Sequence, residues 1–329
     1  MSENVQIVAP IARELLLSEL TENNLLRRTN KCNNEIYCFT AHECPNLMKE
    51  VGRLREMAFR AAGGGTGKGM DIDEYDTAEI PYYQLVVWSP ADKEILGGYR
   101  YIVCKDAEKK ADGELKLATN HMFVFSDKFK KEYLPYTLEL GRSFVHPDFQ
   151  SSNKDKLAKS IFVLDNLWDG LGALFKVYPD MKYFFGKITM YPHYHNEARI
   201  LLAHFFKKYF SDEERLVYPE EPMPLEYDRE KYEDIFTGET YKENYKILSH
   251  EIRSLGEKIP PLFNAYMNLS PSMKHFGTAI NKRFGNVQET AILLTIADIY
   301  EAKKKRHLSS YIPTLYFKLP KNIFSKKKY

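Results

Sequence analysis

The sequence lacks the hallmarks of several protein classes. Its four cysteines in 329 residues are too few for a disulfide scaffold and indicate a reduced cytoplasm. No apolar run approaches the ~18 residues of a membrane-spanning helix. The first thirty residues lack the basic start and apolar core of a signal peptide, so none is expected. A hydrophobic content of 44% with 14% aromatic residues excludes a disordered chain.

Acidic residues are also missing from positions 303–329, which hold nine basic residues. The whole chain has 47 basic and 45 acidic residues, so residues 1–302 carry 38 against 45, a net charge of −7. Apolar and aromatic side chains lie between these lysines: Tyr311, Ile312, Leu315, Tyr316, Phe317, Leu319, Ile323 and Phe324. This pattern suits an anionic bilayer surface. Nucleic acid would accept the same charge, and a tail that packs its rings on the body is the third alternative.

The hydrophobic pattern predicts a single α/β architecture rather than two independent domains. Alternation and β-branched or aromatic content predict strands at 35–40, 82–88, 95–103, 138–146, 183–190, 272–284 and 290–298. Helical spacing predicts helices at 44–62, 154–175, 194–210 and 243–269, the last interrupted by two prolines. The acidic stretch 212–242 is interpreted as an insertion.

Four short motifs follow one another along these elements. They are Arg55-x-x-x-Phe59, Asp71-x-Asp73-x-x-Asp76, Gly98-Tyr-Arg100 and Glu139-x-x-Arg142. In this order they resemble the GNAT-type N-acyltransferases that use long acyl chains, over about residues 35–300. That group includes acyl-homoserine lactone synthases and the ornithine-lipid or glycine-lipid N-acyltransferases, often labelled "hemolysin". The segment LWDGLGALF at 167–175 favours the lipid branch.

The resemblance implies an α/β fold with a GNAT-like mixed central sheet flanked by helices. Its domains would be an N-terminal extension, 1–34, an acyltransferase domain, 35–300, and a basic aromatic tail, 301–329. The implied enzyme moves a fatty acyl group, typically 3-hydroxylated, from acyl carrier protein to the α-amine of an amino acid in aminolipid biosynthesis. The resemblance is strongest to bacterial glycine N-acyltransferases, with ornithine as the competing acceptor. The implied location is cytoplasmic, or peripheral on the inner face of the membrane, without a nucleic-acid partner.

The chemistry needs a base, because a thioester carbonyl reacts with an uncharged amine and not with an ammonium group. Glu139 is the candidate base, and Arg142 is the second catalytic candidate. The alternative is that Glu139 only pairs with Arg142 or Arg100 to hold the strands. Backbone N–H groups near Phe144 and Val145 are expected to stabilise the oxyanion of the tetrahedral intermediate.

The charged motifs are candidates for binding the acceptor amino acid. The residues assigned to this role are Arg55, Phe59, Asp71, Asp73, Asp76 and Arg100. Arg55, Arg100 and Arg142 could bind the carboxylate of the amino acid through bidentate contacts. The aspartates could neutralise these arginines or hold the acceptor ammonium. A structural ion-pair network near the active cleft explains the same residues equally well.

The acyl donor is expected next to the helix predicted at 154–175. Many GNAT enzymes bind the coenzyme A pyrophosphate with a Q/R-x-x-G-x-G/A loop that opens a helix. The matching residues here are Gln150, Ser151, Ser152, Asn153, Lys154 and Asp155, with Asn153 and Asp155 in place of the two glycines. This favours a phosphopantetheine thioester on acyl carrier protein over acyl-CoA, with no other cofactor bound. Lys154, Lys156 and Lys159 form either a dock for an acidic carrier or an ordinary solvated helix face.

Three other signals are discounted. The run GGGTGKG at 63–69 lacks the Ser/Thr that follows the P-loop lysine, and it follows a helix. We interpret it as a mobile loop that leads into the acidic motif and could gate the acceptor. Cys32, Cys38 and Cys44 are spaced too widely for a zinc site, and His193-x-His195 is expected to cap or pack a loop, so no metal is predicted. The functional alternative is a non-catalytic, membrane-associated protein with the same fold.

Overall fold

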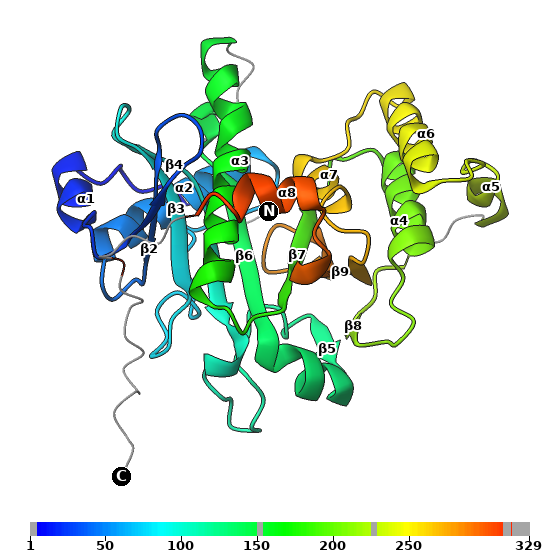
Figure 1. Ribbon diagram of the computed structural model, residues 1–329, viewed down its shortest axis with the longest axis horizontal. Helices are drawn as coiled ribbons and strands as arrows, with labels where there is room; N and C mark the ends of the chain where they lie inside the picture. Colours follow the sequence, from blue (N-terminus) through cyan, green and yellow to red (C-terminus); the bar gives the residue numbers. More distant parts are fainter. Residues whose placement is uncertain (1–4, 150–153, 225–228, 312–316, 318–329) are drawn as a thin grey trace. The chain divides into compact units, whose positions relative to one another are not determined.

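The computed structural model describes residues 5–149, 154–224, 229–311 and 317 (Figure 1). The predicted donor loop at 150–153 and residues 312–316 and 318–329 of the tail lie outside the described residues. The chain forms two compact units. Unit 1 comprises Met1–Ala118, Pro135–Lys182 and Glu301–Tyr329, and unit 2 comprises Thr119–Leu134 and Tyr183–Tyr300. Residues of the predicted domain 35–300 therefore fall in both units, while the predicted extension and tail both belong to unit 1.

Unit 1 contains a five-strand antiparallel arrangement in the order β1-β2-β3-β4-β6. The strands are β1 (Leu25–Arg28), β2 (Glu35–Phe39), β3 (Tyr83–Ser89), β4 (Glu94–Val103) and β6 (Thr137–Val145). Four of them confirm predicted strands, each within about a residue of its expected bounds. Strand β1 was not predicted, and it lies within the expected N-terminal extension.

Helices cover both faces of this sheet. Unit 1 contains α1 (Arg13–Glu19), α2 (Pro45–Ala61), α3 (Lys154–Val177) and α8 (Glu301–His307). Neighbouring residues of β3 point to opposite faces. Gln84 meets Arg55 of α2, whereas Leu85 lies against Gly170 of α3. Helices α2 and α3 therefore pack on opposite faces, and Figure 1 shows α8 beside α3.

The buried face of α3 differs from the predicted one. Apolar spacing in the sequence predicts an inward face made of Leu157, Ile161, Leu164, Trp168, Leu171 and Phe175. In the structure Leu171 is buried, and Leu164, Trp168 and Phe175 are half-buried. The side chains of Leu157 and Ile161 are not described. The buried apolar residues are instead Val163, Leu167, Leu171, Ala173 and Leu174. Two glycines account for the rotation. A Cβ atom at Gly170 would lie 2.8 Å from Leu85 Cδ2, and one at Gly172 would lie 2.5 Å from the carbonyl oxygen of His307. A hydropathy pattern gives glycines no weight, although here they allow β3 and α8 to pack closely against α3.

The end of the described chain returns to unit 1 and packs against α3. His307 Nδ1 lies 2.8 Å from Oδ1 of Asp169, which has no exposed side-chain surface. The Asp169 carboxylate also accepts the backbone N–H of Asn30 at 2.9 Å. Arg27 of β1 donates to the His307 carbonyl at 3.3 Å, and its guanidinium lies 5.7 Å from the buried ring of Tyr311. The first part of the predicted tail thus belongs to the core of unit 1.

Unit 2 contains a three-strand antiparallel arrangement and a separate strand pair. Its strands are β7 (Tyr183–Met190), β10 (Val287–Thr295) and β9 (Lys274–Asn281), with β5 (Phe123–Phe125) paired to β8 (Val217–Pro219). Its helices are α4 (Asn196–Phe210), α5 (Arg229–Glu233), α6 (Tyr241–Ser254) and α7 (Pro261–Met267). The predicted strands and helices are confirmed, including the break before α7. Strands β5 and β8 were missed because three residues carry no clear periodicity.

Aromatic residues supply much of the core of unit 2. Four phenylalanines from different elements pack with ring centroids 5.1 to 6.3 Å apart: Phe125, Phe129, Phe185 and Phe276. Such pairs add to the stabilisation that comes from buried apolar area. With helices flanking the sheets in both units, the predicted α/β class is confirmed.

Candidate active site

The polar site of unit 1 is built on one face of its sheet. Gln84, Arg100 and Gly141 are register partners across β3, β4 and β6, so they share a face. Glu139 lies two residues before Gly141 and therefore belongs to the same face. Gln84, Arg100 and Glu139 are all buried. Buried polar groups of this kind must find partners within the protein. Residues of α2 and of the segment 71–76 are the partners of Gln84 and Arg100, and Tyr82 is the partner of Glu139.

Arg55 enters this face from α2. Its guanidinium lies 3.1 and 3.2 Å from the two carboxylate oxygens of Asp76 and donates to Gln84 Oε1 at 2.5 Å. Gln84 in turn donates to Asp76 at 3.0 Å. Neither Arg55 nor Asp76 has any exposed side-chain surface. These contacts join α2 to the sheet. The Arg55–Asp76 pair is thus part of a buried ion-pair network.

Arg100 occupies the centre of the network. Its Nη1 atom lies 2.7 Å from Asp73 Oδ1 and 3.2 Å from Asp76 Oδ2. The guanidinium also lies 5.5 and 5.1 Å from the ring centroids of Tyr75 and Tyr82, within cation–π range. Burial alone would lower the pKa of Arg100, but the two aspartates outweigh it and raise the pKa well above its ordinary value.

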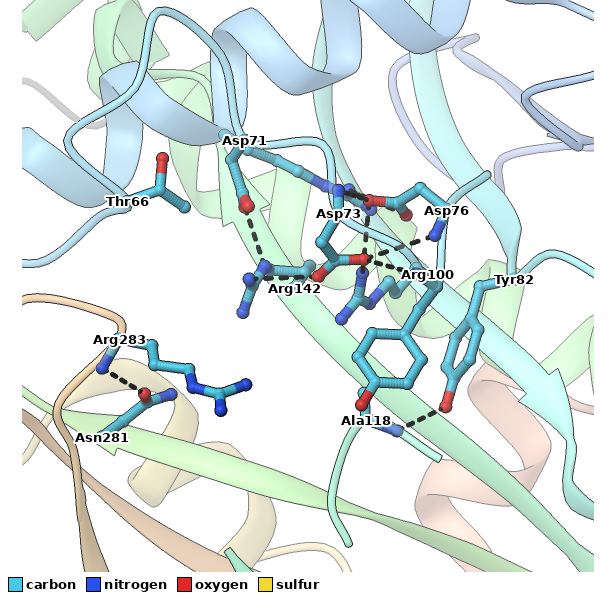
Figure 2. A network of polar contacts seen from close by, with 12 residues as sticks. Thr66, Asp71, Asp73, Asp76, Tyr82, Arg100, Ala118, Arg142, Asn281 and Arg283 are labelled. Atoms are coloured by element: carbon cyan, nitrogen blue, oxygen red, sulfur yellow. Dashed lines mark hydrogen bonds and ion pairs between the residues drawn. The ribbon is translucent and has the colours of Figure 1, made fainter. Parts of the chain in front are cut away.

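Arg142 reaches the same face through a β-bulge. Glu139 and Arg142 are three residues apart, so a regular strand would place them on opposite faces. Between the pairs Gly98–Phe144 and Arg100–Gly141, however, β6 has one residue more than β4. Arg142 lies in this bulge with φ at +49°, in the left-handed region. The bulge turns its side chain towards the aspartates, with Nε 2.8 Å from Asp71 Oδ2 and Nη2 3.4 Å from Asp73 Oδ2 (Figure 2).

The aspartates differ in environment. The side chain of Asp71 has no exposed surface, and burial raises its pKa above the ordinary value although Arg142 and Arg55 act in the opposite direction. Asp73 remains 18% exposed. Burial would raise its pKa too, but Arg100, which also donates a hydrogen bond, and Arg142 lower it below the ordinary value. Asp73 is therefore held as a carboxylate at neutral pH.

Glu139 has a hydroxyl partner of its own. The hydroxyl of Tyr82 donates to the Glu139 carboxylate. The same hydroxyl accepts the backbone N–H of Ala118 at 2.9 Å (Figure 2). Burial and the Glu139 charge raise the pKa of Tyr82 well above its ordinary value, so the phenol stays protonated. Glu139 is thus a buried carboxylate oriented by a tyrosine hydroxyl, on the same sheet face as the ion-pair network.

Residues 54–159, which include most of this network, match the Acetyltransferase (GNAT) domain. The chain is 57% identical over 307 residues to a glycine N(alpha)-acyltransferase of Bacteroides thetaiotaomicron, covering 93% of this chain and 90% of that one. It is 55% identical to one from Phocaeicola vulgatus, with 93% and 94% covered. The chain belongs to the GNAT N-acyltransferases. This confirms the predicted enzyme class.

A solved structure, that of the AHL synthase LasI, also resembles this N-acyltransferase. The match covers 47% of this chain and 71% of that one, at 17% identity and a TM-score of 0.32. The likeness is too slight to bear on residue roles. No helix in the described part of the N-acyltransferase is long and apolar enough to cross a membrane.

The predicted donor residues are only partly described. Phe144 is buried and Val145 half-buried on β6, where they pair with Gly98 and Gly97 of β4. A Cβ atom at Gly97 would lie 2.6 Å from the Phe144 carbonyl oxygen, so the glycine pair allows β4 to approach the bulged strand. Residues Gln150, Ser151, Ser152 and Asn153 lie outside the described residues. Lys154 begins α3, as expected for a loop that opens a helix.

The remaining predicted residues lie as follows. Phe59 is buried on α2, where its ring belongs to the core of unit 1. His195 immediately precedes α4 without a side-chain capping bond, and the ring of His193 stacks on Tyr191 at 6.2 Å. Both histidines are exposed, and His195 does not cap the helix with its side chain.

Sequence reasoning missed Tyr82 and Gln84. Both come from the segment YYQLVVW, which was recognised only as an apolar strand. The signal was a single glutamine within that apolar run. In a buried strand such a residue needs a polar partner, and the nearby arginine motifs could have supplied one.

Proposed function

We propose that this N-acyltransferase moves a fatty acyl group, typically 3-hydroxylated, from acyl carrier protein to the α-amine of glycine in aminolipid biosynthesis. One observation carries the choice of acceptor: both relatives, at 57 and 55% identity over 93% of the chain, are glycine N(alpha)-acyltransferases. Identity at this level over nearly the whole chain favours a shared substrate.

Two members of the charged network are partly exposed, which supports a role in binding the acceptor. Arg142 and Asp73 keep 15 and 18% of their side-chain surface exposed, whereas Arg55, Asp71 and Asp76 have none. Glycine carries one carboxylate and one ammonium group a single carbon apart. In the proposal its carboxylate binds the Arg142 guanidinium, and its ammonium is attracted to Asp73. The fully buried pairs hold these two groups in place.

Glu139 then acts as the base. It takes a proton from the acceptor ammonium, directly or through a water, and the amine nitrogen attacks the thioester carbonyl carbon. The C–S bond breaks as the amide forms, and the thiol of the carrier leaves with a proton. Backbone N–H groups near Phe144 and Val145 stabilise the oxyanion of the intermediate. Tyr82 orients the Glu139 carboxylate throughout.

The sequence supports the proposed donor and cellular site. Asn153 and Asp155 replace the two glycines of the pyrophosphate loop, which favours the single phosphate of a carrier-bound phosphopantetheine over the coenzyme A pyrophosphate. The product is an amphiphile, so release at a bilayer keeps its acyl chain out of water. The lysines and aromatic residues of the tail suit a peripheral location on an anionic membrane surface.

The test is incubation with 3-hydroxyacyl carrier protein and isotopically labelled glycine, with mass spectrometry of the product. We expect labelled N-(3-hydroxyacyl)glycine. Ornithine in a parallel reaction should give less product. Glycinamide, which has the amine but lacks the carboxylate, should be a poor acceptor because Arg142 has nothing to bind. A preference for ornithine would refute the acceptor, and no N-acylated product from any amino acid would refute the proposed reaction.

A further inference from the structure

Glu56, which no motif includes, binds the glycine-rich loop. It follows Arg55 on α2, and its side chain has no exposed surface. Its carboxylate accepts the Thr66 backbone N–H at 3.0 Å, the Thr66 hydroxyl at 2.7 Å and the Gly67 backbone N–H at 2.8 Å. Arg60, one turn later, donates to the same carboxylate at 2.7 Å. Four donors thus converge on one buried acid.

This contact explains the P-loop-like run GGGTGKG. Gly63, Gly65 and Gly67 have φ values of +87°, +95° and +75°, in the left-handed region that glycine adopts without strain. Such turns direct successive N–H groups into a concavity that binds an anion. In a P-loop the anion is phosphate. Here the carboxylate of Glu56 fills the concavity, so the loop is bonded to α2 and does not project freely.

The loop leads directly into the aspartates of the site. Arg55 holds Asp76 at one end of the segment, and Glu56 holds Thr66 and Gly67 at the other. Adjacent residues of one helix therefore fix both ends of the stretch that carries Asp71 and Asp73. Between these ends the Asp71 backbone N–H donates to the Gly52 carbonyl of α2 at 2.9 Å.

α2 approaches this segment closely at position 52. A Cβ atom at Gly52 would lie 2.6 Å from Ile72 Cγ1, so a larger residue there would have to displace the Ile72 side chain. The N-terminal segment adds a further layer over the loop. Val5 N–H donates to the Gly67 carbonyl at 3.1 Å, and Val8 N–H donates to the Gly69 carbonyl at 3.0 Å. The loop is thus held from both sides.

We propose that Glu56 is a positioning residue for the acceptor amino acid. It sets the register of the loop, and through it the places of Asp71 and Asp73 relative to Arg142. This inference rests on the proposed transfer to glycine. The hydroxyl of Tyr82 holds Glu139. Tyr82 itself meets the segment at Tyr75, whose carbonyl accepts the Tyr82 backbone N–H at 2.9 Å, next to the Asp76 that Arg55 anchors. Glu56 therefore acts on the base less directly than on Asp71 and Asp73. Loss of Glu56 should therefore weaken acceptor binding more than it slows the chemical step.

The test compares steady-state kinetics of Glu56→Gln with those of the unaltered enzyme. Glutamine keeps the shape of the side chain but replaces one carboxylate oxygen by an NH₂ group. Because this group cannot accept a hydrogen bond from a backbone N–H, at least one contact to the loop is lost. We expect the KM for glycine to rise about 10-fold, with kcat within about twofold and the KM for the acyl carrier protein unchanged, the pattern of lost ground-state binding. Thr66→Val, which replaces the hydroxyl by a methyl group, should also raise the KM for glycine. Thr66→Ser keeps the hydroxyl and should have the KM of the unaltered enzyme.

Glu50→Gln is the matched control. Glu50 is also a buried acid of α2, with a salt bridge to Arg53 at 2.6 Å and a bond from Ile11 N–H at 3.1 Å, but it does not bind the loop. We expect Glu50→Gln to lower thermal stability without changing the KM for glycine. The inference would be overturned if folded Glu56→Gln had an unchanged KM for glycine, or if Glu50→Gln raised this KM equally. If Glu56→Gln does not fold, an unchanged KM for glycine in Thr66→Val would overturn it instead. Failure of the unaltered enzyme to acylate glycine would instead reject the proposed function.

Discussion

The Nε atom of Arg142 lies 2.8 Å from Oδ2 of Asp71, a carboxylate with no exposed surface. The contact is an ion pair and not an aligned hydrogen bond. Its two members play different parts, since Arg142 is partly exposed at a bulge whereas Asp71 is enclosed. The arginine therefore neutralises a buried acid and also presents a cation to the acceptor. These two roles can be separated by mutation.

We expect Arg142→Met to destabilise the protein by about 3–5 kcal/mol, because it leaves the Asp71 charge buried and uncompensated. Adding Asp71→Asn should recover much of that stability. Both variants should have little activity with glycine, since both lack the guanidinium. The measurements are urea unfolding of the full-length protein and the rate of glycine acylation. If the double variant is no more stable than Arg142→Met, the ion pair is not what holds Asp71.

The same pair predicts a dependence on pH. Burial already raises the pKa of Asp71, and without Arg142 the pKa should rise further. A carboxyl whose pKa is higher in the folded state than in the unfolded state favours folding when it is protonated. Arg142→Met should therefore lose stability, relative to the double variant, as the pH rises through the folded-state pKa of Asp71. Parallel pH profiles for the two variants would contradict this assignment.

Glu139→Gln should keep the fold and lower kcat at least ~100-fold, the scale expected when a general base is lost. Tyr82 can still donate to the amide oxygen, so the loss should come from the missing proton acceptor. Glu94→Gln makes the same chemical change on β4, where the acid meets Arg13, and should leave turnover unchanged. Circular dichroism checks folding of both. A folded Glu139→Gln with normal turnover would remove Glu139 from the catalytic role.

The carrier preference can be measured with one acyl group on two donors. We expect a higher kcat/KM for acyl carrier protein than for coenzyme A. Reversing the charges of Lys154, Lys156 and Lys159 to glutamate should raise the KM for the carrier and reduce its dependence on salt. Lys176→Glu, in the last turn of the same helix, is the control. Equal kcat/KM on both donors would refute the preference, and an equal effect of Lys176→Glu would show that the three lysines are not a specific dock.

The tail prediction needs a deletion point that the fold permits. Removal of everything from residue 303 would also remove His307 and Tyr311, which are buried in unit 1. Deletion of 318–329 removes five lysines and keeps that core. We expect the full chain to co-sediment with anionic vesicles and not with neutral ones, less so at high salt, and the shortened chain to bind much less while retaining activity on dissolved substrates. Equal binding of both chains to anionic vesicles would show that residues 318–329 are not what binds the membrane.

The elements with clear periodicity were predictable because burial imposes it. Strand β7 and the interrupted pair α6 and α7 follow directly from apolar spacing and from two adjacent prolines. The face of α3 was misjudged because Gly170 and Gly172 allow close packing but contribute nothing to hydropathy. The division into two units was not predictable either, since it depends on contacts between residues far apart in the sequence.

At the site, motif order brought the charged residues together but did not supply their geometry. The predicted charged residues Arg55, Asp76 and Arg100 do meet in one network. Their partner Gln84 was hidden in an apolar strand. The bulge that turns Arg142 towards Asp71 has no signature of its own, because a left-handed arginine is unfavourable locally and is maintained by the surrounding contacts. Glu56 was overlooked because a glutamate on a helix ordinarily faces solvent.

The return of the chain's end to α3 has a consequence for synthesis on the ribosome. Unit 2 is complete once residue 300 has emerged, whereas unit 1 still lacks α8 and the groups that engage Arg27 and Asp169. The unit that starts first is thus the one finished last, contrary to the usual order in which the N-terminal part folds first. A chain whose synthesis stops shortly before His307 keeps every proposed catalytic residue yet leaves Asp169 buried without its histidine. Such products are expected to be poorly folded and open to proteolysis, so completion of unit 1 depends on translation past His307.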